Sequence, residues 1–150
     1  MRKSPIRSLS RKGYRYNWRP DLPDQRDFLF AERAPEPRPA MLPPKVDLRS
    51  GCSPVFDQGK IGSCTGNALA GAIEYLELSE LRDSIDDSKQ VQIFAKKRFA
   101  HVSRLFIYYN ERMIEGRTDQ DSGAMLRDGI KALCDWGVCR ESTWKYSPGQ

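Results

Sequence analysis

One cysteine stands where a thiol could do chemistry. In the stretch DQGKIGSCTGNALAGAIEYLE, residues 57–77, Cys64 lies between a glycine-rich segment and the start of an expected helix. A thiol attacks as the thiolate, and the amide dipoles at a helix start favour that negative charge. First-turn amides have no partner inside the helix, so the N–H of Cys64 could donate to an oxyanion. The position favours a nucleophile, and an inert core thiol is the alternative.

Gln58 offers a second donor. It precedes Cys64 by six residues, and the loop between them contains Gly59 and Gly62. A loop of this length can fold back and bring the carboxamide beside the thiol. Acyl transfer needs such a pair of donors aimed at one developing oxyanion. The alternative is that the Gln58 side chain only caps the loop.

A long helix is expected to position the thiol. Apolar residues at helical spacing predict it over residues 63–81, namely Leu69, Ala72, Ile73 and Leu76. Ser63 is a suitable N-cap. Small residues between positions 66 and 72 would let another element pack closely, so we expect this helix to be central and buried.

Two further helices are expected downstream. The first covers residues 102–115 and ends at Gly116; its inward face is expected to contain Val102, Leu105, Phe106, Tyr109 and Met113. The second covers residues 122–136 and ends at Gly137. Asp121 or Ser122 would cap its start, and its inward residues would be Met125, Ile130 and Leu133. Residues 82–98 are interpreted as a loop, and Val46 and Leu48 indicate a short edge strand within residues 42–51.

The charge is concentrated at the amino-terminal end. The chain has 150 residues and a net charge of +5, and its first twenty residues hold seven basic side chains and no acid. Such an arm can touch nucleic acid or an anionic membrane, but a solvated tail is favoured and nucleic acid is not the expected partner. The sequence contains neither a membrane-spanning apolar run nor a Sec-type signal, which favours a cytoplasmic protein or export by another route.

The other cysteines give no clear metal site. Cys52, Cys134 and Cys139 could be combined with His101 as a zinc set, but their spacing matches no strong zinc pattern. They are too few for a disulfide scaffold. Core or loop thiols are therefore favoured, and neither a metal nor another cofactor is expected.

The stretch PVFDQGKIGSCTGNALAGAIEYLE resembles the active-site segment of papain-like cysteine peptidases, where a Gln and a glycine turn precede Gly-Ser-Cys at the start of the central helix. LPPKVDLRSG resembles the family's mature amino terminus. QDSGAMLRDGIKALCDWGVCRESTWKY resembles its substrate-side glycine loop, next helix and Tyr-bearing turn. The resemblance spans residues 42–146 and implies an α+β papain-like fold. This chain would supply mainly the helical left-hand domain with its long central helix, and the β-rich right-hand domain would be largely missing.

The resemblance also implies roles for single residues. Cys64 would be the nucleophile and Gln58 the oxyanion side chain. Substrate contacts would come from Gly62, Ser63, Ser122, Gly123, Ala124 and Met125. Gly123 would bind the substrate backbone, whereas Ala124 and Met125 would line the apolar pocket for the second residue before the scissile bond. For Met125, plain helix core is the alternative.

The sequence departs from the family pattern near the thiol and in the arm. Thr65 replaces the usual aromatic residue after the nucleophile, and Ile61 replaces a disulfide-forming cysteine. We interpret residues 1–41 as a basic, proline-rich arm and residues 42–150 as the peptidase part. The arm is too short for the family's large prosegment, and PDLPDQRDFLF could instead cover the cleft of a zymogen through Phe28 and Phe30.

A further departure is the missing base. Papain-like catalysis uses a His and an Asn roughly 130–150 residues after the cysteine, but the sequence given stops 86 residues after Cys64. Its single histidine, His101, is interpreted as a surface or helix-start residue. We therefore expect the amino-terminal half of a peptidase acting on peptides or proteins, inactive alone, with the remaining half of the domain either cut from this sequence or supplied by a second polypeptide. A non-catalytic papain-like binding module and a basic-arm nucleic-acid binder are the competing hypotheses.

Overall fold

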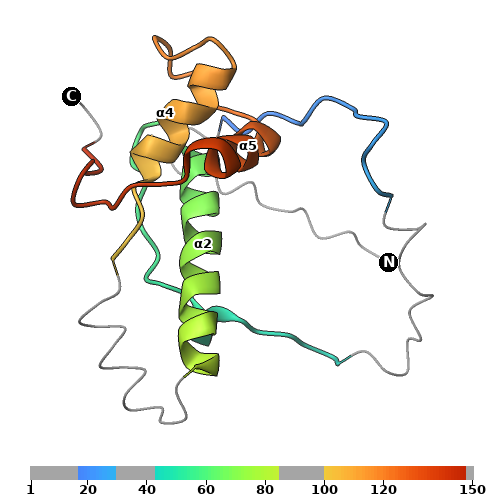
Figure 1. Cartoon of the computed structure of the whole chain (residues 1–150), viewed down its shortest axis with the longest axis vertical. Helices are drawn as coiled ribbons and strands as arrows, with labels where there is room; N and C mark the ends of the chain where they lie inside the picture. The colour runs from blue at the N-terminus through green and yellow to red at the C-terminus, as the bar shows by residue number, and fades with distance from the viewer. Residues whose placement is uncertain (1–16, 30–42, 85–99, 148–150) are drawn as a thin grey trace, which may run out of the picture.

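Three α-helices make up most of the structure, a computed structural model that describes residues 17–29, 43–84 and 100–147. They are α2 (Cys64–Asp83), α4 (Arg104–Ile114) and α5 (Leu126–Trp136), and a short 3-10 helix, η2 (Arg49–Gly51), precedes them. Helices α4 and α5 pack around the amino-terminal part of α2, whose far end extends beyond them (Figure 1). The described ranges hold two isolated β-bridges and no longer strand. None of the described helices is long and apolar enough to cross a membrane.

Helix α2 begins at Cys64, as the sequence predicts, but it buries a different face. The buried residues are Thr65, Gly66, Ala70 and Glu74. Leu76, placed in the predicted stripe, is 60% exposed, and Ala72 is also exposed. The reason is the close approach of α4, because a Cβ at Gly66 would lie 2.7 Å from the carbonyl oxygen of Arg104. A small residue therefore lies at the crossing with α4, while Leu69 and Ile73 of the predicted stripe pack against the core.

Helix α4 also turns a face inward that the apolar pattern does not predict. Ile107, Tyr108 and Glu111 are each at most 1% exposed, whereas the predicted inward residues Tyr109 and Met113 are 36% and 41% exposed. Two polar groups of this buried face have hydrogen-bond partners, since the Tyr108 hydroxyl donates to Asp121 and Glu111 Oε2 accepts from Thr65, whereas Glu111 Oε1 is buried without a partner among the described residues. Two expectations hold nonetheless: Val102 is buried, and Gly116 follows the end of the helix with a φ of +66°.

Helix α5 begins four residues later than predicted. Its N-cap residue is Met125, in extended conformation, and neither Asp121 nor Ser122 caps it. The predicted inward residue Ile130 is 53% exposed, whereas Leu133 packs against the core. The predicted end is confirmed, since Gly137 adopts a φ of +68° and donates its N–H to the carbonyl oxygen of Leu133 at 3.0 Å.

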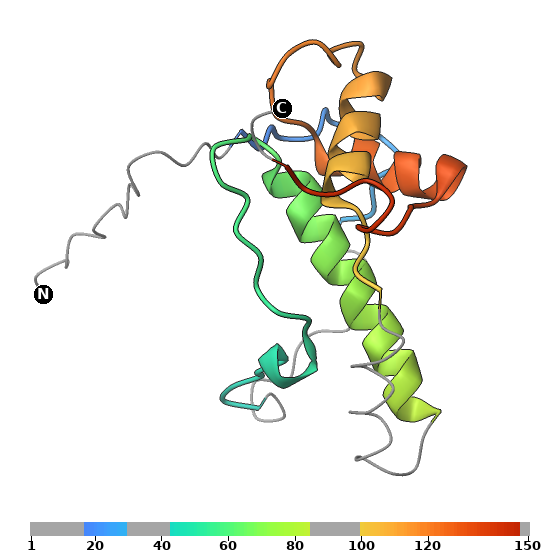
Figure 2. The ribbon, with the colours of Figure 1, turned by 90° about the vertical axis from the view of Figure 1, so that its left-hand side faces the viewer.

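The segment before α2 is not a strand. Val46 and Leu48, the basis of the predicted edge strand, are 70% and 56% exposed. Residues 49–51 form η2 instead, which Arg82 of α2 holds by donating to the carbonyl oxygen of Gly51 at 2.7 Å. From there the chain runs beside α2 back to its amino-terminal end (Figure 2). Of the predicted loop over 82–98, Arg82 and Asp83 belong to α2 and residues 85–99 lie outside the described residues.

The apolar core is small. Ala70, Val102 and Ile107 form its buried centre, and four partly buried residues pack against it: Leu69, Ile73, Leu133 and Val138.

The amino-terminal segment 17–29, which we call the docked arm, lies against the loop before α5 and the start of that helix. Arg19 forms a parallel β-bridge with Met125, and its N–H donates to the carbonyl oxygen of Ala124 at 3.1 Å. The proposed boundary between residues 41 and 42 stays a prediction, because residues 30–42 are outside the described ranges.

Candidate active site

Cys64 is the first residue of α2, and its side chain is half-buried. The turn that holds it is fixed from one side by Asn67, whose Nδ2 donates to the carbonyl oxygen of Ser63 at 2.9 Å and to its Oγ at 3.1 Å. Ser63 itself is fully buried. The thiol thus combines a rigid backbone with partial access from outside.

Gln58 and Ser63 lie at opposite ends of the loop before Cys64, and Tyr146 ties them together. Its hydroxyl donates to the carbonyl oxygen of Gln58 at 2.8 Å and lies 2.5 Å from Ser63 Oγ. The Gln58 side chain is largely buried and its Nε2 donates to the carbonyl oxygen of Ile61 at 3.0 Å. The loop is therefore folded back on itself, while the predicted placement of the Gln58 carboxamide beside the thiol stays a prediction.

Asp121 joins this loop to the one before α5. Its carboxylate accepts from the N–H of Gly62 at 2.9 and 3.1 Å and from the Tyr108 hydroxyl at 2.6 Å. The same hydroxyl accepts from the N–H of Gly123 at 3.0 Å. Burial, followed by the bond to Asp121, raises the pKa of Tyr108, so the phenol keeps its proton and donates. The two glycine-containing loops are thereby brought side by side.

In the loop predicted to bind substrate, one backbone group pairs with an extended chain. The N–H of Gly123 points inward to Tyr108, so the backbone group that pairs with an extended chain here is the carbonyl of Ala124. Ser122 Oγ lies 3.2 Å from the carbonyl oxygen of Gly123, Ala124 is fully buried, and Met125 is half-buried. The docked arm pairs with Ala124, and substrate binding at Gly123, which the resemblance implies, stays a prediction.

The docked arm covers both glycine-containing loops at Asn17. Asn17 Nδ2 donates to the carbonyl oxygen of Asp121 at 3.2 Å. A Cβ added at Gly62 would lie 2.7 Å from Asn17 Nδ2, and one added at Gly123 would lie 2.5 Å from Asn17 Cβ. Gly123 also has a φ of +72°. Glycine is therefore required at 123 for its own conformation and for the approach of the arm.

The expectation that Phe28 and Phe30 cover the cleft stays a prediction. Phe28 is 73% exposed, and Phe30 lies outside the described residues. The hydrogen bonds described above between the arm and the loop before α5 come from the Asn17 side chain and the Arg19 backbone.

A buried polar layer lies behind the thiol. Thr65, which replaces the aromatic residue of the family pattern, is 2% exposed and donates to Glu111 Oε2 at 2.6 Å. Burial raises the pKa of Glu111 to about 7. Gly129 of α5 faces this carboxyl group, since a Cβ there would lie 2.4 Å from Glu111 Oε1. The hydroxyl of Thr65 thus makes the packing behind Cys64 polar.

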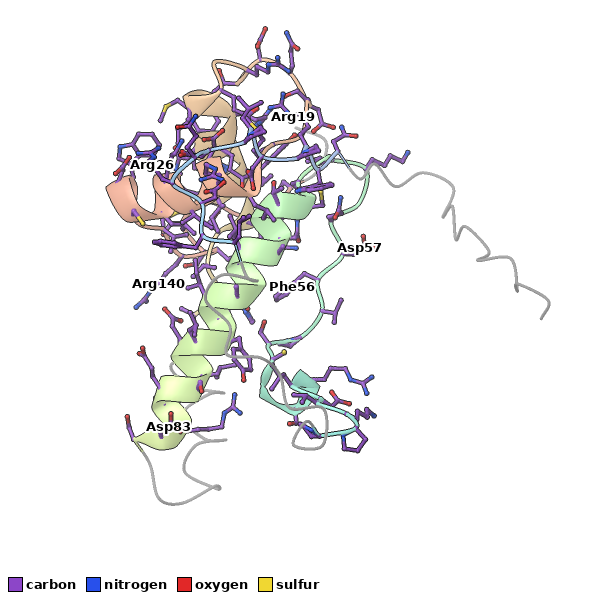
Figure 3. The ribbon with its side chains drawn as sticks, turned by 90° about the vertical axis from the view of Figure 1, so that its right-hand side faces the viewer. Arg19, Arg26, Phe56, Asp57, Asp83 and Arg140 are labelled. Carbon is purple, nitrogen blue, oxygen red and sulfur yellow. The ribbon has the colours of Figure 1, made fainter. Side chains whose placement is uncertain are left out.

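His101 lies away from the thiol. Its Nδ1 is 3.2 Å from Glu74 Oε1, and its ring meets that of Phe56 edge-on at 4.8 Å between centroids. Phe56, labelled in Figure 3, comes from the segment that runs beside α2. Glu74 is ten residues after Cys64, or about 15 Å along the helix axis. His101 precedes α4, as the sequence predicts. Because its partner Glu74 is this far along α2 from Cys64, His101 does not act as the base for the thiol.

Sequence reasoning missed the residues that assemble the site. Tyr108, Asp121 and Tyr146 hold the loops, and Glu115 accepts from the N–H of Met125 at 3.0 Å. Asp121 was considered only as a helix cap, and no periodicity marks the others. In the described ranges no three His, Cys, Asp or Glu residues gather closely enough to hold a metal ion.

The chain is similar to known cysteine peptidases. It is 45% identical to xylellain, a cysteine protease from Xylella fastidiosa, and its structure matches that crystal structure with a TM-score of 0.63 over 91% of this chain and 44% of the other. It is also 44% identical over 93 residues to an uncharacterized peptidase C1-like protein, L477, of Acanthamoeba polyphaga mimivirus. That match covers 62% of this chain and 25% of the viral protein. No family model matches the sequence. The chain thus spans less than half the length of either relative.

Proposed function

Since the chain is a relative of the papain-like cysteine peptidases, we propose that it supplies the nucleophile and oxyanion hole of a cysteine peptidase. The observation that carries the proposal is the placement of Cys64. A half-buried thiol begins α2, directly after a folded-back loop that Asp121 fastens to a second, peptide-pairing loop. A peptide lying on the second loop would pass close to the first turn of α2.

The chemistry would be acyl transfer. The Cys64 sulfur attacks the substrate carbonyl carbon as a thiolate, a C–S bond forms, and the carbonyl electrons move to oxygen. The Cys64 N–H and Gln58 Nε2 would donate to that oxyanion. The C–N bond then breaks as the amine leaves with a proton, and water later releases the acid and restores the thiol.

The base would come from polypeptide outside these 150 residues. The sequence given has a single histidine, and His101 is bound to Glu74, which lies nearly three helical turns after Cys64. We propose that the His and Asn lie on the remaining half of the domain, in the same or another polypeptide. The 150-residue chain alone would then react once with a thiol-directed reagent and show no turnover.

A peptidyl epoxide tests the thiol. We expect mass spectrometry to find the epoxide on Cys64, because the peptide part docks beside it, and not on the exposed Cys52 and Cys134. Iodoacetamide, which has no peptide part, should label Cys52 and Cys134 as well. Cys64→Ser should abolish the epoxide adduct. Equal labelling of all exposed thiols by the epoxide would contradict a peptide-guided nucleophile and favour the second hypothesis, a non-catalytic peptide-binding module.

We also propose that the docked arm covers the site in a zymogen. Asn17 packs on Gly62 and Gly123, which the family resemblance assigns to substrate binding. Asn17→Ala should therefore speed epoxide labelling of Cys64. Leu22→Ala serves as the comparison, because this arm side chain is 72% exposed and should not affect the rate. Labelling that is no faster in Asn17→Ala than in Leu22→Ala would contradict the cover.

A further inference from the structure

Glu115 is a buried carboxylate beside the edge that pairs with the docked arm. It follows the last residue of α4, and its side chain is only 4% exposed. Oε1 accepts from the N–H of Met125 at 3.0 Å. Oε2 is buried and, among the described residues, accepts no hydrogen bond, but it forms an ion pair with Arg19 of the arm. A buried carboxylate needs a cation, and here the cation is delivered by an extended chain.

The geometry at Arg19 is that of a peptide residue in a subsite. Its backbone N–H donates to the carbonyl oxygen of Ala124, while its side chain turns toward Glu115. Figure 3 labels Arg19 where the arm passes α4. When an extended peptide pairs with such an edge, its main-chain hydrogen bonds give affinity and fix its position. Pockets for alternate side chains then give specificity. The neighbouring Trp18 is 54% exposed, consistent with this alternation.

We propose that Glu115, together with the edge at Ala124 and Met125, forms a subsite for a cationic side chain, arginine or lysine, of an extended peptide. In this structure the arm's own Arg19 occupies it. When the arm leaves, Glu115 Oε2 loses its partner, so a peptide that brings a guanidinium or ammonium group is favoured over a neutral one. This proposal rests on the proposed function only in that the bound peptide would be a substrate.

The ion pair can be tested in the intact chain by hydrogen exchange at the Arg19 amide. Arg19→Met and Glu115→Gln should each speed exchange at least about tenfold, because each leaves one charge without its partner. The double variant should exchange no faster than Glu115→Gln alone, and Arg19→Lys should retain most of the protection. Arg26→Met is the matched control, since Arg26 pairs with Asp24 inside the arm. Unchanged exchange in both single variants, or additive effects, would overturn the pairing.

A second measurement tests binding from outside. In the Arg19→Met chain, a labelled peptide of residues 15–23 with arginine at its fifth position should bind at least about tenfold tighter than one with citrulline, its neutral isostere. Adding Glu115→Gln should remove the difference. Equal binding, or binding of neither peptide, would overturn the subsite. Neither measurement uses the thiol, so both can be made in Cys64→Ser. An unreactive Cys64 would contradict the proposed peptidase function but would not affect the proposed subsite.

Discussion

At the scale of single residues, the site depends on polar groups that are buried and paired. The carboxylate of Asp121 binds Gly62 and Tyr108, and Glu111 accepts from Thr65 behind the thiol. Such pairs are expensive to break because the interior offers no water as a substitute. They fix the two loops against the helices without contributing to an apolar pattern in the sequence.

Glu111 should make stability depend on pH. Burial raises its pKa in the folded chain from 4.5 to about 7. Between these values the unfolded chain has lost a proton that the folded chain keeps, so the contribution of Glu111 to stability should fall as pH rises from 4.5 to 7 and stay constant outside that window. The loss is up to about 3 kcal/mol. Urea unfolding at several pH values should show it.

Glu111→Gln should flatten this dependence, since a carboxamide does not titrate and its oxygen can still accept from Thr65. Glu80→Gln, on the exposed side of α2, should leave the dependence in place. A steep fall in stability that persists in Glu111→Gln would show that another group is responsible.

At the scale of elements, the crossing of α2 and α4 sets which side chains are buried. The two helices meet where Gly66 faces the backbone of Arg104 and the Cβ of Tyr108. Close approach of this kind excludes large side chains from the crossing. Leu76 lies ten residues further along α2, toward the end that extends beyond α4 and α5 (Figure 1), and it is exposed.

Two glycines of α2 should respond oppositely to alanine. Gly66→Ala would place a Cβ 2.7 Å from Arg104 O and should destabilise the chain by about 1–3 kcal/mol. At Gly71 nothing lies within 4 Å, so alanine should stabilise by about 0.5–1 kcal/mol through its better helix propensity. Urea or thermal unfolding of both variants measures the difference. Equal effects at the two positions would contradict the tight crossing.

At the scale of the whole molecule, the docked arm completes the start of α5. Met125, the N-cap residue of α5, provides no side-chain cap, but Asp21 Oδ1 accepts from the N–H of Arg127 at 2.9 Å. Asp27 also pairs with the Arg127 guanidinium at 2.7 and 2.9 Å. Asp21, more than one hundred positions away in the sequence, therefore caps the start of α5 in place of a local residue.

Asp21→Ala should weaken that helix start. The lost cap should cost about 1 kcal/mol and speed hydrogen exchange at the Arg127 amide. Asp24→Ala is the control, since the Asp24 carboxylate hydrogen-bonds to Arg26 of the same turn. If both variants behave alike, the arm does not cap α5 in solution.

The sequence by itself determined the local features. It placed Cys64 at the start of a long helix and located the helix ends at Gly116 and Gly137, because helix caps and left-handed glycines depend on neighbours along the chain. Its resemblance to papain-like peptidases agrees with the structural match to xylellain.

Only the tertiary structure decided which helix faces are buried and what holds the site. Apolar spacing placed Leu76, Tyr109 and Ile130 inside, yet all are exposed, since close crossings and paired polar groups fill the interior. Only the tertiary structure also brings Arg19 and Glu115 together, which are 96 residues apart in the sequence. Their pairing arises from chain segments meeting in space, and no spacing along the sequence encodes it.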